Sequence, residues 1–473
     1  MDRGELMKLS KEEIIEYLFT VIKDMSKTIQ VQREEIDELK ARLNQNSKNS
    51  SNPPSRDVYD KPKSLRKPSG KKAGGQSGHE GKGLKLMAEP DKYVSYEPQE
   101  CTNCPKAAEC QADKTVCETR YEIDIEVRTI TTAHQITRVT CPQSAKMLAG
   151  EFPDYINSSM QYGVNLKALA VSLNTVGMVS INRTHEILSG VFDVPISTGT
   201  ISAMVSDCAQ TVKSTVDEIK EAVKNEPLVH EDETGTRVDK RNAWAHVSST
   251  ESLTYIEMNE SRGKKGMDAI GILTVFLGTL IHDCWASYFL YTNIRHGLCN
   301  AHLLRELTAV WENAKQAWAQ ELMGLVLEMK SVKEKLLSQN ILEPPKELLE
   351  KFNLAFDKIL EEALALNPVP VPDKTKKGKP KRGKTGALVD RLILRKGEFL
   401  LFFTDFSIPF DNNQAERDFR MFKVKQKVSG GFRTMQGAKD FAAIMSYTGT
   451  ARKRGIPAFY AIKNALIGMP FSV

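Results

Sequence analysis

The sequence lacks an apolar run long enough to cross a membrane. Its longest apolar stretch, residues 269–281, is interrupted by threonine and glycine, whereas a membrane-spanning helix needs about 20 predominantly apolar residues. The first residues also lack a basic start followed by an apolar core, so we expect no signal peptide. These absences predict a cytoplasmic protein with no membrane partner.

Evenly spread cysteines and a recognisable internal repeat are also missing. Five of the eight cysteines fall between residues 101 and 141, whereas a disulfide framework spreads its cysteines along the chain. This distribution agrees with a cytoplasmic location. The length of 473 residues allows two to four domains and a sizeable core.

A large excess of charge of one sign is absent, because the net charge is only +6. The basic residues are instead concentrated in KPKSLRKPSGKK (61–72) and DKTKKGKPKRGKTGA (373–387). Both segments contain proline or glycine, which is typical of flexible basic linkers that bind phosphate. A linker that is merely soluble has a similar composition, and this alternative stays open.

What the chain does have, first, is a heptad pattern over residues 15–43. One heptad position holds Ile15, Ile22, Ile29, Ile36 and Leu43, and the other holds Leu18, Met25, Gln32 and Leu39. Isoleucine at one position and leucine at the other favour a parallel two-stranded coiled coil. We therefore predict a homodimer; the alternative is an amphipathic helix packed on its own domain.

A group of cysteines begins with the CxxC pair Cys101 and Cys104. Structural zinc takes four tetrahedral ligands, and a CxxC pair is the usual first half of such a site. Because no second CxxC follows, the predicted zinc ligands are Cys101, Cys104, Cys117 and Cys141, with Cys110 as a rival. A set of free thiols is the alternative.

Several helices and strands are expected around and after this group. Residues 120–141 alternate in the manner of strands, which predicts a small β-rich zinc module. Residues 160–225 have a helical pattern that includes a helix, a tight turn and a helix capped by Ser197 or Thr198. This is a plausible helix-turn-helix, although paired helices that do not read DNA are commoner.

Carboxylates stand at the ends of predicted elements in the second half of the chain. Residues 225–261 resemble three short strands, the first of which ends in HEDE. A helix is expected at 267–278, and an apolar strand after it ends at Asp283. Glu416 lies on an expected helix, whose start we expect the preceding asparagines to order. Hard divalent cations prefer such oxygen ligands, and two ions about 3.5–4 Å apart support phosphoryl transfer.

Three stretches containing these acids are more specific. HEDETG (230–235), HDCWASY (282–288) and DNNQAERDFR (411–420) closely resemble the acidic motifs of the transposase of the insertion sequence 66 family, a DDE-type enzyme. The resemblance covers nearly the whole chain. The zipper, a linker with NSSNPPS, the GGQSGH stretch, the cysteines and a C-terminal catalytic region occur in the family's order.

The resemblance implies an α/β fold, with a ribonuclease H-like catalytic domain interrupted by a helical insertion and preceded by a coiled coil and a small zinc-binding module. It implies Asp232, Asp283 and Glu416 as catalytic residues that hold two Mg²⁺ ions, with Mn²⁺ as a substitute, beside a structural Zn²⁺. The implied reaction is cleavage at the element's ends, followed by attack of the freed 3′-OH on target DNA. Neighbouring acids remain rivals, namely Glu231, Glu233 and Asp239 for the first position and Asp411 and Asp418 for the third.

The implied partners are element-end and target DNA and accessory proteins from the same element, in a bacterial, nucleoid-associated setting. Phosphate contacts are expected from basic and histidine side chains: Arg417, Arg420, Lys423, Lys425, His302, Lys71 and Lys72. His302 belongs to CNAHLLREL (299–307), which resembles the family's Cys-x-x-His stretch. A structural or DNA-contact role is favoured there over a zinc site, because only two soft ligands are in view. A nuclease on the same fold and an inactive DNA-binding protein are the alternatives.

The predicted organisation runs from a coiled coil to a helical tail. Its parts are a coiled-coil helix (1–45), a basic Gly/Pro/Ser-rich linker (46–92), a cysteine zinc module (93–150), a helical, helix-turn-helix-like region (151–225), the first part of the ribonuclease H-like domain (226–298), a helical insertion with basic linker (299–395), the end of the catalytic domain (396–430) and a C-terminal helical tail (431–473).

Overall fold

The computed structural model describes residues 10–46, 48–50, 89–105, 107–111, 115–125, 127–370 and 382–473. The chain divides into two units, one of residues 1–62 and 133–473 and the other of residues 63–132. Lys71, Lys72 and the GGQSGH stretch lie outside the described residues, as does most of the basic segment 373–387.

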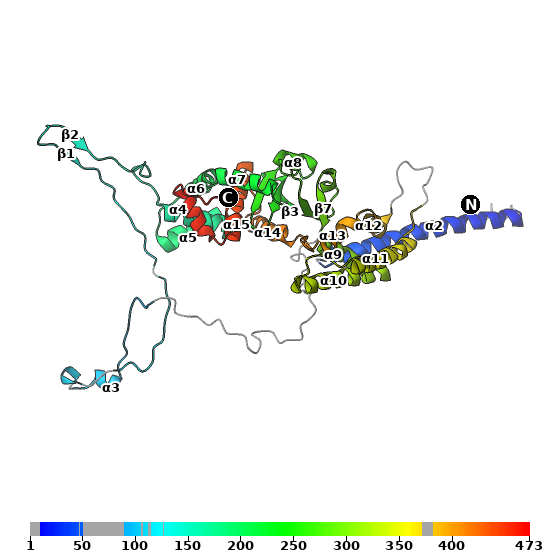
Figure 1. Ribbon diagram of the computed structural model, residues 1–473, viewed down its shortest axis with the longest axis horizontal. Helices are drawn as coiled ribbons and strands as arrows, with labels where there is room; N and C mark the ends of the chain where they lie inside the picture. Colours follow the sequence, from blue (N-terminus) through cyan, green and yellow to red (C-terminus); the bar gives the residue numbers. More distant parts are fainter. Residues whose placement is uncertain are drawn as a thin grey trace. The chain divides into compact units, whose positions relative to one another are not determined.

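A five-stranded mixed sheet forms the centre of the larger unit (Figure 1). Its strands are β3 (Leu228–Val238), β4 (Arg241–Ser249), β5 (Thr254–Asn259), β6 (Thr279–His282) and β7 (Arg295–Leu298). The spatial order is β5-β4-β3-β6-β7. The first three strands pair antiparallel, and β3, β6 and β7 pair parallel. The three predicted strands of residues 225–261 are thus confirmed, as is the strand that ends just before Asp283.

Two details of this region differ from the sequence expectation. The helix expected at 267–278 is only α8 (Lys264–Ile270), which ends at Gly271 in the left-handed region with φ 78°. Glycine adopts this conformation at little steric cost, so the helix stops there. The short edge strand β7 was not predicted, because four residues carry too little alternation to be recognised.

The two faces of the sheet pack against different helices. On one face, α14 (Asn413–Ser429) and α15 (Met435–Lys453) cover Ala243, Ala245 and Val247 of β4. On the other face, residues of the α8 segment pack with Val229 and Leu280. Figure 1 shows α8 and α14 on either side of the sheet. Because successive side chains of a strand point to opposite faces, neighbouring carboxylates on β3 alternate between the α14 face and the α8 face.

The helices α4 (Val164–Thr175), α5 (Ile181–Phe192), α6 (Thr198–Thr211) and α7 (Lys213–Lys224) occupy the segment predicted to be helical. Ser197, rather than Thr198, is the N-cap of α6, and its hydroxyl accepts a hydrogen bond from the Thr200 amide at 3.1 Å. Helix α6 contains no lysine or arginine. The helix-turn-helix shape is therefore present, but this helix supplies no cation for phosphate.

The C-terminal residues are helical as predicted, but they do not form a peripheral tail. Helix α15 packs along β5, and α16 (Ala458–Leu466) packs on α4. The Ser446 hydroxyl of α15 accepts a hydrogen bond from the Ile256 amide at 2.8 Å. Residues 431–473 therefore complete the core that holds the sheet, since α15 is largely buried.

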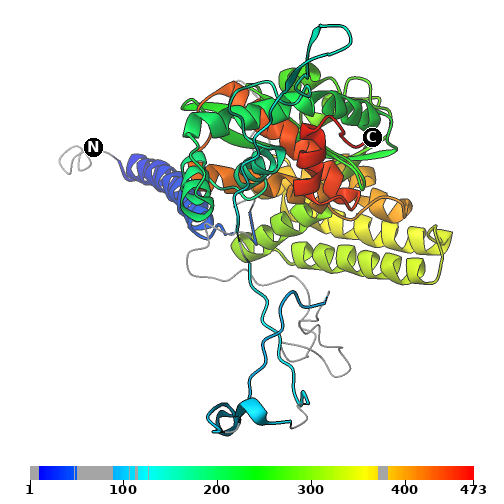
Figure 2. The ribbon, with the colours of Figure 1, turned by 90° about the vertical axis from the view of Figure 1, so that its left-hand side faces the viewer.

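The insertion after β7 is helical, as expected. It consists of α9 (Asn300–Ala314), α10 (Ala317–Ser338), α11 (Lys346–Leu366) and α12 (Gly383–Leu394), and α13 (Lys396–Thr404) follows it. Figure 2 shows the long helices α10 and α11 side by side. Lys333 of α10 is buried and donates hydrogen bonds to the carbonyls of Phe402 at 2.9 Å and Ile408 at 2.6 Å. This lysine ties the insertion to the chain that leads into α14.

The N-terminal heptad residues lie on one helix, α2 (Lys11–Leu43), which begins with a capping box between Ser10 and Glu13. The helix is therefore confirmed, while its pairing with a second chain stays a prediction. Its apolar heptad side chains are exposed in the single chain, with Ile22 at 57% and Ile29 at 59%. In the described part of the chain, no helix is long and apolar enough to span a membrane.

The cysteine region contains little regular structure. The smaller unit holds α3 (Gln99–Thr102) and the 3₁₀ turn η2 (Ala107–Glu109), together with Cys101, Cys104, Cys110 and Cys117. Cys141 belongs to the larger unit, in a hairpin of β1 (Arg138–Thr140) and β2 (Met147–Ala149). The strands expected over 120–141 are limited to β1, because their alternating side chains are exposed rather than packed on a second layer. All five thiols are free, and the zinc site stays a prediction.

Candidate catalytic site

Alternation along β3 separates the acids of HEDETG onto two faces. Val229 belongs to the core on the α8 face, and Val238 belongs to the core against α14. Successive side chains of a strand point to opposite faces. Asp232 therefore faces α14, whereas Glu231 and Glu233 face the α8 side. Sequence spacing could not rank these three neighbours, but the pleat of the strand separates them.

Glu231 and Glu233 are engaged on their own face. Glu231 is buried and accepts a short hydrogen bond from the Ser248 hydroxyl of β4. Glu233 accepts hydrogen bonds from the Arg262 guanidinium at 2.6 Å and from the Tyr288 hydroxyl at 2.6 Å. Both carboxylates therefore have structural partners. The third rival, Asp239, lies in the turn between β3 and β4 with φ 45°.

The parallel register of β3 and β6 places Asp283 beside Asp232. Leu228 pairs with Thr279 and His230 pairs with Ile281, and continuing this register by two residues pairs Asp232 with Asp283. Paired residues of parallel strands point to the same face. Burial, followed by the nearby charges of Glu233 and Asp283, raises the pKa of Asp232 to about 8, although the Lys423 cation acts in the opposite direction. Asp283 thus lies close enough to oppose the ionisation of Asp232.

Helix α14 brings Glu416 to the same face of the sheet through a clamp at its start. Asn412, only 2% exposed, donates from its side chain to the Glu231 carbonyl at 2.7 Å, and its side-chain oxygen lies 2.8 Å from the His230 ring. Its backbone amide donates to Cys299 Sγ at 3.2 Å. Asn412 makes no side-chain cap bond of its own. It orders the helix start by joining it to β3 on the residues just before Asp232.

Glu416 lies in the first turn of α14 and faces His302 of α9. Its Oε1 atom is 3.9 Å from His302 Nδ1, and both atoms are buried without a hydrogen-bond partner among the described residues. Its rivals are engaged elsewhere. Asp411 accepts from the Asn413 amide at 3.1 Å, and Asp418 forms an ion pair with Lys453 at 2.8 Å. Sequence analysis left Cys299 out of this site, and its only signal was the Cys-x-x-His spacing.

The predicted basic residues of α14 do not all reach solvent. Arg417, Arg420 and Lys423 are exposed. Lys425 is the exception: it is only 7% exposed, and its ammonium donates to the Asn174 carbonyl at 3.3 Å. Burial lowers the pKa of Lys425 to about 8. Lys425 is therefore a structural contact to α4, and we correct its assignment as a DNA contact.

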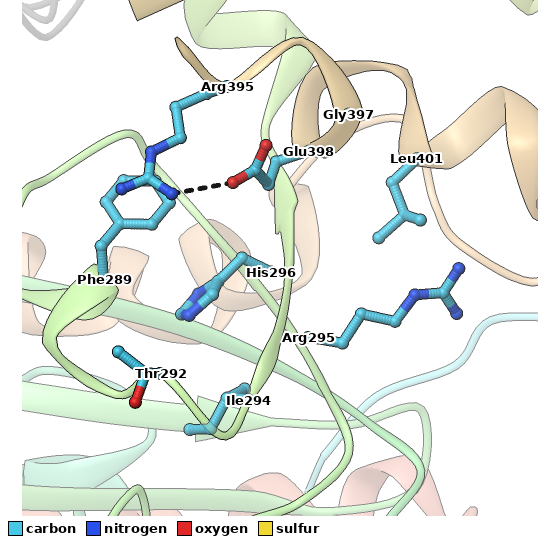
Figure 3. Close-up of a pocket in the computed structure, with 9 residues that line it drawn as sticks. All are labelled: Phe289, Thr292, Ile294, Arg295, His296, Arg395, Gly397, Glu398 and Leu401. Carbon is cyan, nitrogen blue, oxygen red and sulfur yellow. Dashed lines mark hydrogen bonds and ion pairs between the residues drawn. The ribbon is translucent and has the colours of Figure 1, made fainter.

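A pocket beside β7 lies away from these acids. It measures about 560 Å³ and is lined by Phe289, His296 and Arg395, among others (Figure 3). Arg395 stacks over Phe289 at 3.9 Å and pairs with Glu398 at 2.9 Å. The pocket adjoins the amino end of β7, whereas Asp283 follows the carboxyl end of β6.

Comparison with known protein families gives two matches. Residues 159–440 match the family described as "Transposase IS66 family", and this range contains the sheet, the insertion and all three acids. Residues 7–85 match a "Family of unknown function (DUF6444)". No curated protein matches the chain.

Proposed function

The chain belongs to the IS66 transposase family and is a DDE-type DNA transposase, and from this premise we propose that Asp232, Asp283 and Glu416 are its catalytic, metal-binding acids. The family match covers more than half of the chain. The order β5-β4-β3-β6-β7 agrees with a ribonuclease H-like core. The single observation that carries the proposal is the parallel register of β3 and β6, which, continued by two residues, puts Asp283 beside Asp232 on the face covered by α14.

DDE transposases use divalent metal ions, and the donor set proposed here fits Mg²⁺ or Mn²⁺. Carboxylate oxygens are the ligands these ions prefer. The Asp283 charge helps to raise the pKa of Asp232, and Glu416 Oε1 has no hydrogen-bond partner among the described residues. When bound, two such ions stabilise the attacking and the leaving oxygen of an in-line phosphoryl transfer.

Other residues of the chain position the three acids and offset part of their negative charge. Asn412 holds the start of α14 against β3, so Glu416 is fixed relative to Asp232. Lys423 lowers the pKa of Asp232, against the larger effect of burial, and it lies two turns beyond Glu416 on α14. We propose that the exposed Arg417, Arg420 and Lys423 contact the DNA phosphates. Binding should then weaken steeply with salt.

We also propose that α2 pairs two protomers, which would bring two element ends together. About 2 kcal/mol accompanies the burial of one isoleucine. Replacing Ile22 and Ile29 by lysine should therefore raise the dimer dissociation constant at least about a hundredfold. Sedimentation equilibrium measures this constant. Val31→Lys is the matched control, because Val31 is 56% exposed but lies outside the heptad positions. Equal dissociation by the control would contradict a coiled coil with this register.

The decisive experiment for the function measures joining of DNA strands. Purified full-length protein is incubated with labelled element-end DNA and a supercoiled target, with Mg²⁺ or with EDTA. Wild type should join strands only with Mg²⁺, and Asp232→Asn should bind DNA without joining it. Asp239→Asn, in the β3–β4 turn, should remain active. Cleavage without joining would favour the nuclease alternative, and binding without chemistry would favour an inactive protein or a missing accessory protein.

Proton release should accompany Mg²⁺ binding. The pKa of Asp232 is about 8 in the metal-free protein, above the value of about 3.9 for an unfolded chain. The protonated carboxyl therefore stabilises the fold below pH 4, and this contribution is lost as the pH rises through 8. Because Mg²⁺ needs the carboxylate, its affinity and its effect on Tm should be larger at about pH 8.5 than at about pH 6.5.

Calorimetric titration in two buffers of different ionisation enthalpy measures the released protons. Asp232→Asn should abolish the dependence of the heat on the buffer, whereas Asp239→Asn should keep it. An Mg²⁺ affinity of the wild type that does not change between the two pH values would contradict the protonated state of Asp232.

A further inference from the structure

Cys299, His302 and Glu416 bring three different ligand atoms together. A sulfur, an imidazole nitrogen and a carboxylate oxygen from these residues all lie within 4.8 Å of one another. Cys299 is the N-cap of α9 and His302 lies in its first turn, while Glu416 lies in the first turn of α14. Two helix starts that are far apart in the sequence thus meet at one point.

Two of these atoms lack the partner that buried polar atoms normally have. Within the part of the chain that the structure describes, His302 Nδ1 and Glu416 Oε1 are both buried without a hydrogen-bond partner, although most buried polar side-chain atoms are hydrogen-bonded. They face each other at 3.9 Å, which is too long for a hydrogen bond. Two ligands of one tetrahedral zinc ion, each about 2.0–2.1 Å from it, lie about 3.4 Å apart. The observed gap therefore fits a shared cation better than a direct contact.

Burial raises the pKa of the Cys299 thiol to about 12, and a backbone N–H donor acts against this rise. Cys299 is 2% exposed, and its Sγ accepts the backbone N–H of Asn412 at 3.2 Å. Such an N–H donor stabilises the thiolate form, which is the form that binds a metal. Thiolate and imidazole ligands select zinc-like ions, whereas Mg²⁺ and Mn²⁺ favour sites made only of oxygen. The donor set thus differs in kind from that of Asp232 and Asp283.

We propose that Cys299, His302 and Glu416 form a zinc site, distinct from the cysteine module, that joins the start of α9 to the start of α14. Three protein ligands leave a fourth tetrahedral position open. The Cys299 thiol loses its proton to solvent on binding. The site rests on the proposed function only in that Glu416 belongs to both centres, since a carboxylate can offer one oxygen to each.

The test measures zinc rather than activity. Full-length protein is saturated with Zn²⁺ and dialysed, and the zinc per chain is determined by mass spectrometry. Cys299→Ser and His302→Gln should each hold one zinc per chain less than wild type. Cys208→Ser, at a buried cysteine of α6 outside the site, should hold as much as wild type. Equal zinc in wild type, Cys299→Ser and His302→Gln overturns the site.

A second measurement covers the case in which Cys299→Ser does not fold. His302→Gln keeps the thiol and the helix start, so in Co²⁺-substituted protein its visible spectrum should lose the tetrahedral absorption of one ion per chain. An unchanged spectrum overturns the proposal. Asp232→Asn should retain the full zinc content while failing to join DNA. If the wild type joins no DNA but the zinc difference persists, the proposed reaction fails and the zinc site stands.

Discussion

Glu416→Gln should lose strand joining by at least about a hundredfold while leaving the fold intact. The magnitude follows from removal of an electrostatic contact to the reacting centre. In the metal-free protein the fold should persist, because Glu416 Oε1 has no hydrogen-bond partner among the described residues. Strand-transfer assays measure the first effect and thermal unfolding measures the second. DNA binding should also persist, since Arg417 and Arg420 remain exposed.

Asp418→Asn, two residues further along α14, should instead lower the stability of the fold and keep strand joining. Asp418 accepts hydrogen bonds from Ser249 at 2.7 Å and Thr254 at 2.9 Å and pairs with Lys453. Loss of one partner of a largely buried pair costs about 3 kcal/mol. The Tm should therefore fall, while the joining activity of the protein that remains folded should persist. An unstable Glu416→Gln beside an inactive but stable Asp418→Asn would exchange the roles assigned to these acids.

Asn412→Ala should impair both stability and activity, although Asn412 touches no reacting atom. The substitution leaves the buried Glu231 carbonyl and His230 ring without their partner, and each unsatisfied buried group costs about 1–3 kcal/mol. Because these bonds fix α14 to β3, Glu416 should lose its position relative to Asp232. Loss of such a supporting contact typically lowers metal affinity or activity about 10–100-fold.

The matched control is Asn413→Ala, since Asn413 is exposed at the first position of α14. Its Tm and its activity should stay close to those of wild type. For Asn412→Ala, the Mg²⁺ concentration needed for half-maximal joining should rise, which a purely global loss of stability would not cause. An unchanged Mg²⁺ requirement in folded Asn412→Ala would show that the clamp has no role in positioning Glu416.

The elements that the sequence determined by itself are those with a strong local pattern. The helix α2, the strands β3 to β6 and the helices of the insertion follow from periodicity over many residues. Ser197 could be recognised as a cap because its hydroxyl bonds to an amide three residues along the chain. The three acidic stretches were also visible in the sequence, because each is a contiguous motif.

Only the tertiary structure decided which neighbouring acids share a face of the sheet and which lysine of α14 is exposed. The choice between Asp232 and Glu231 depends on the β3–β6 register, which joins residues about fifty positions apart. Lys425 resembles Lys423 in sequence, but the two lie on opposite sides of α14, and the contact with Asn174 of α4 buries Lys425 while Lys423 stays exposed. The meeting of Cys299, His302 and Glu416 likewise requires two helix starts to pack together. Periodicity is a local property, whereas burial and ligand geometry arise from contacts between distant segments, and these contacts exist only once the chain has folded.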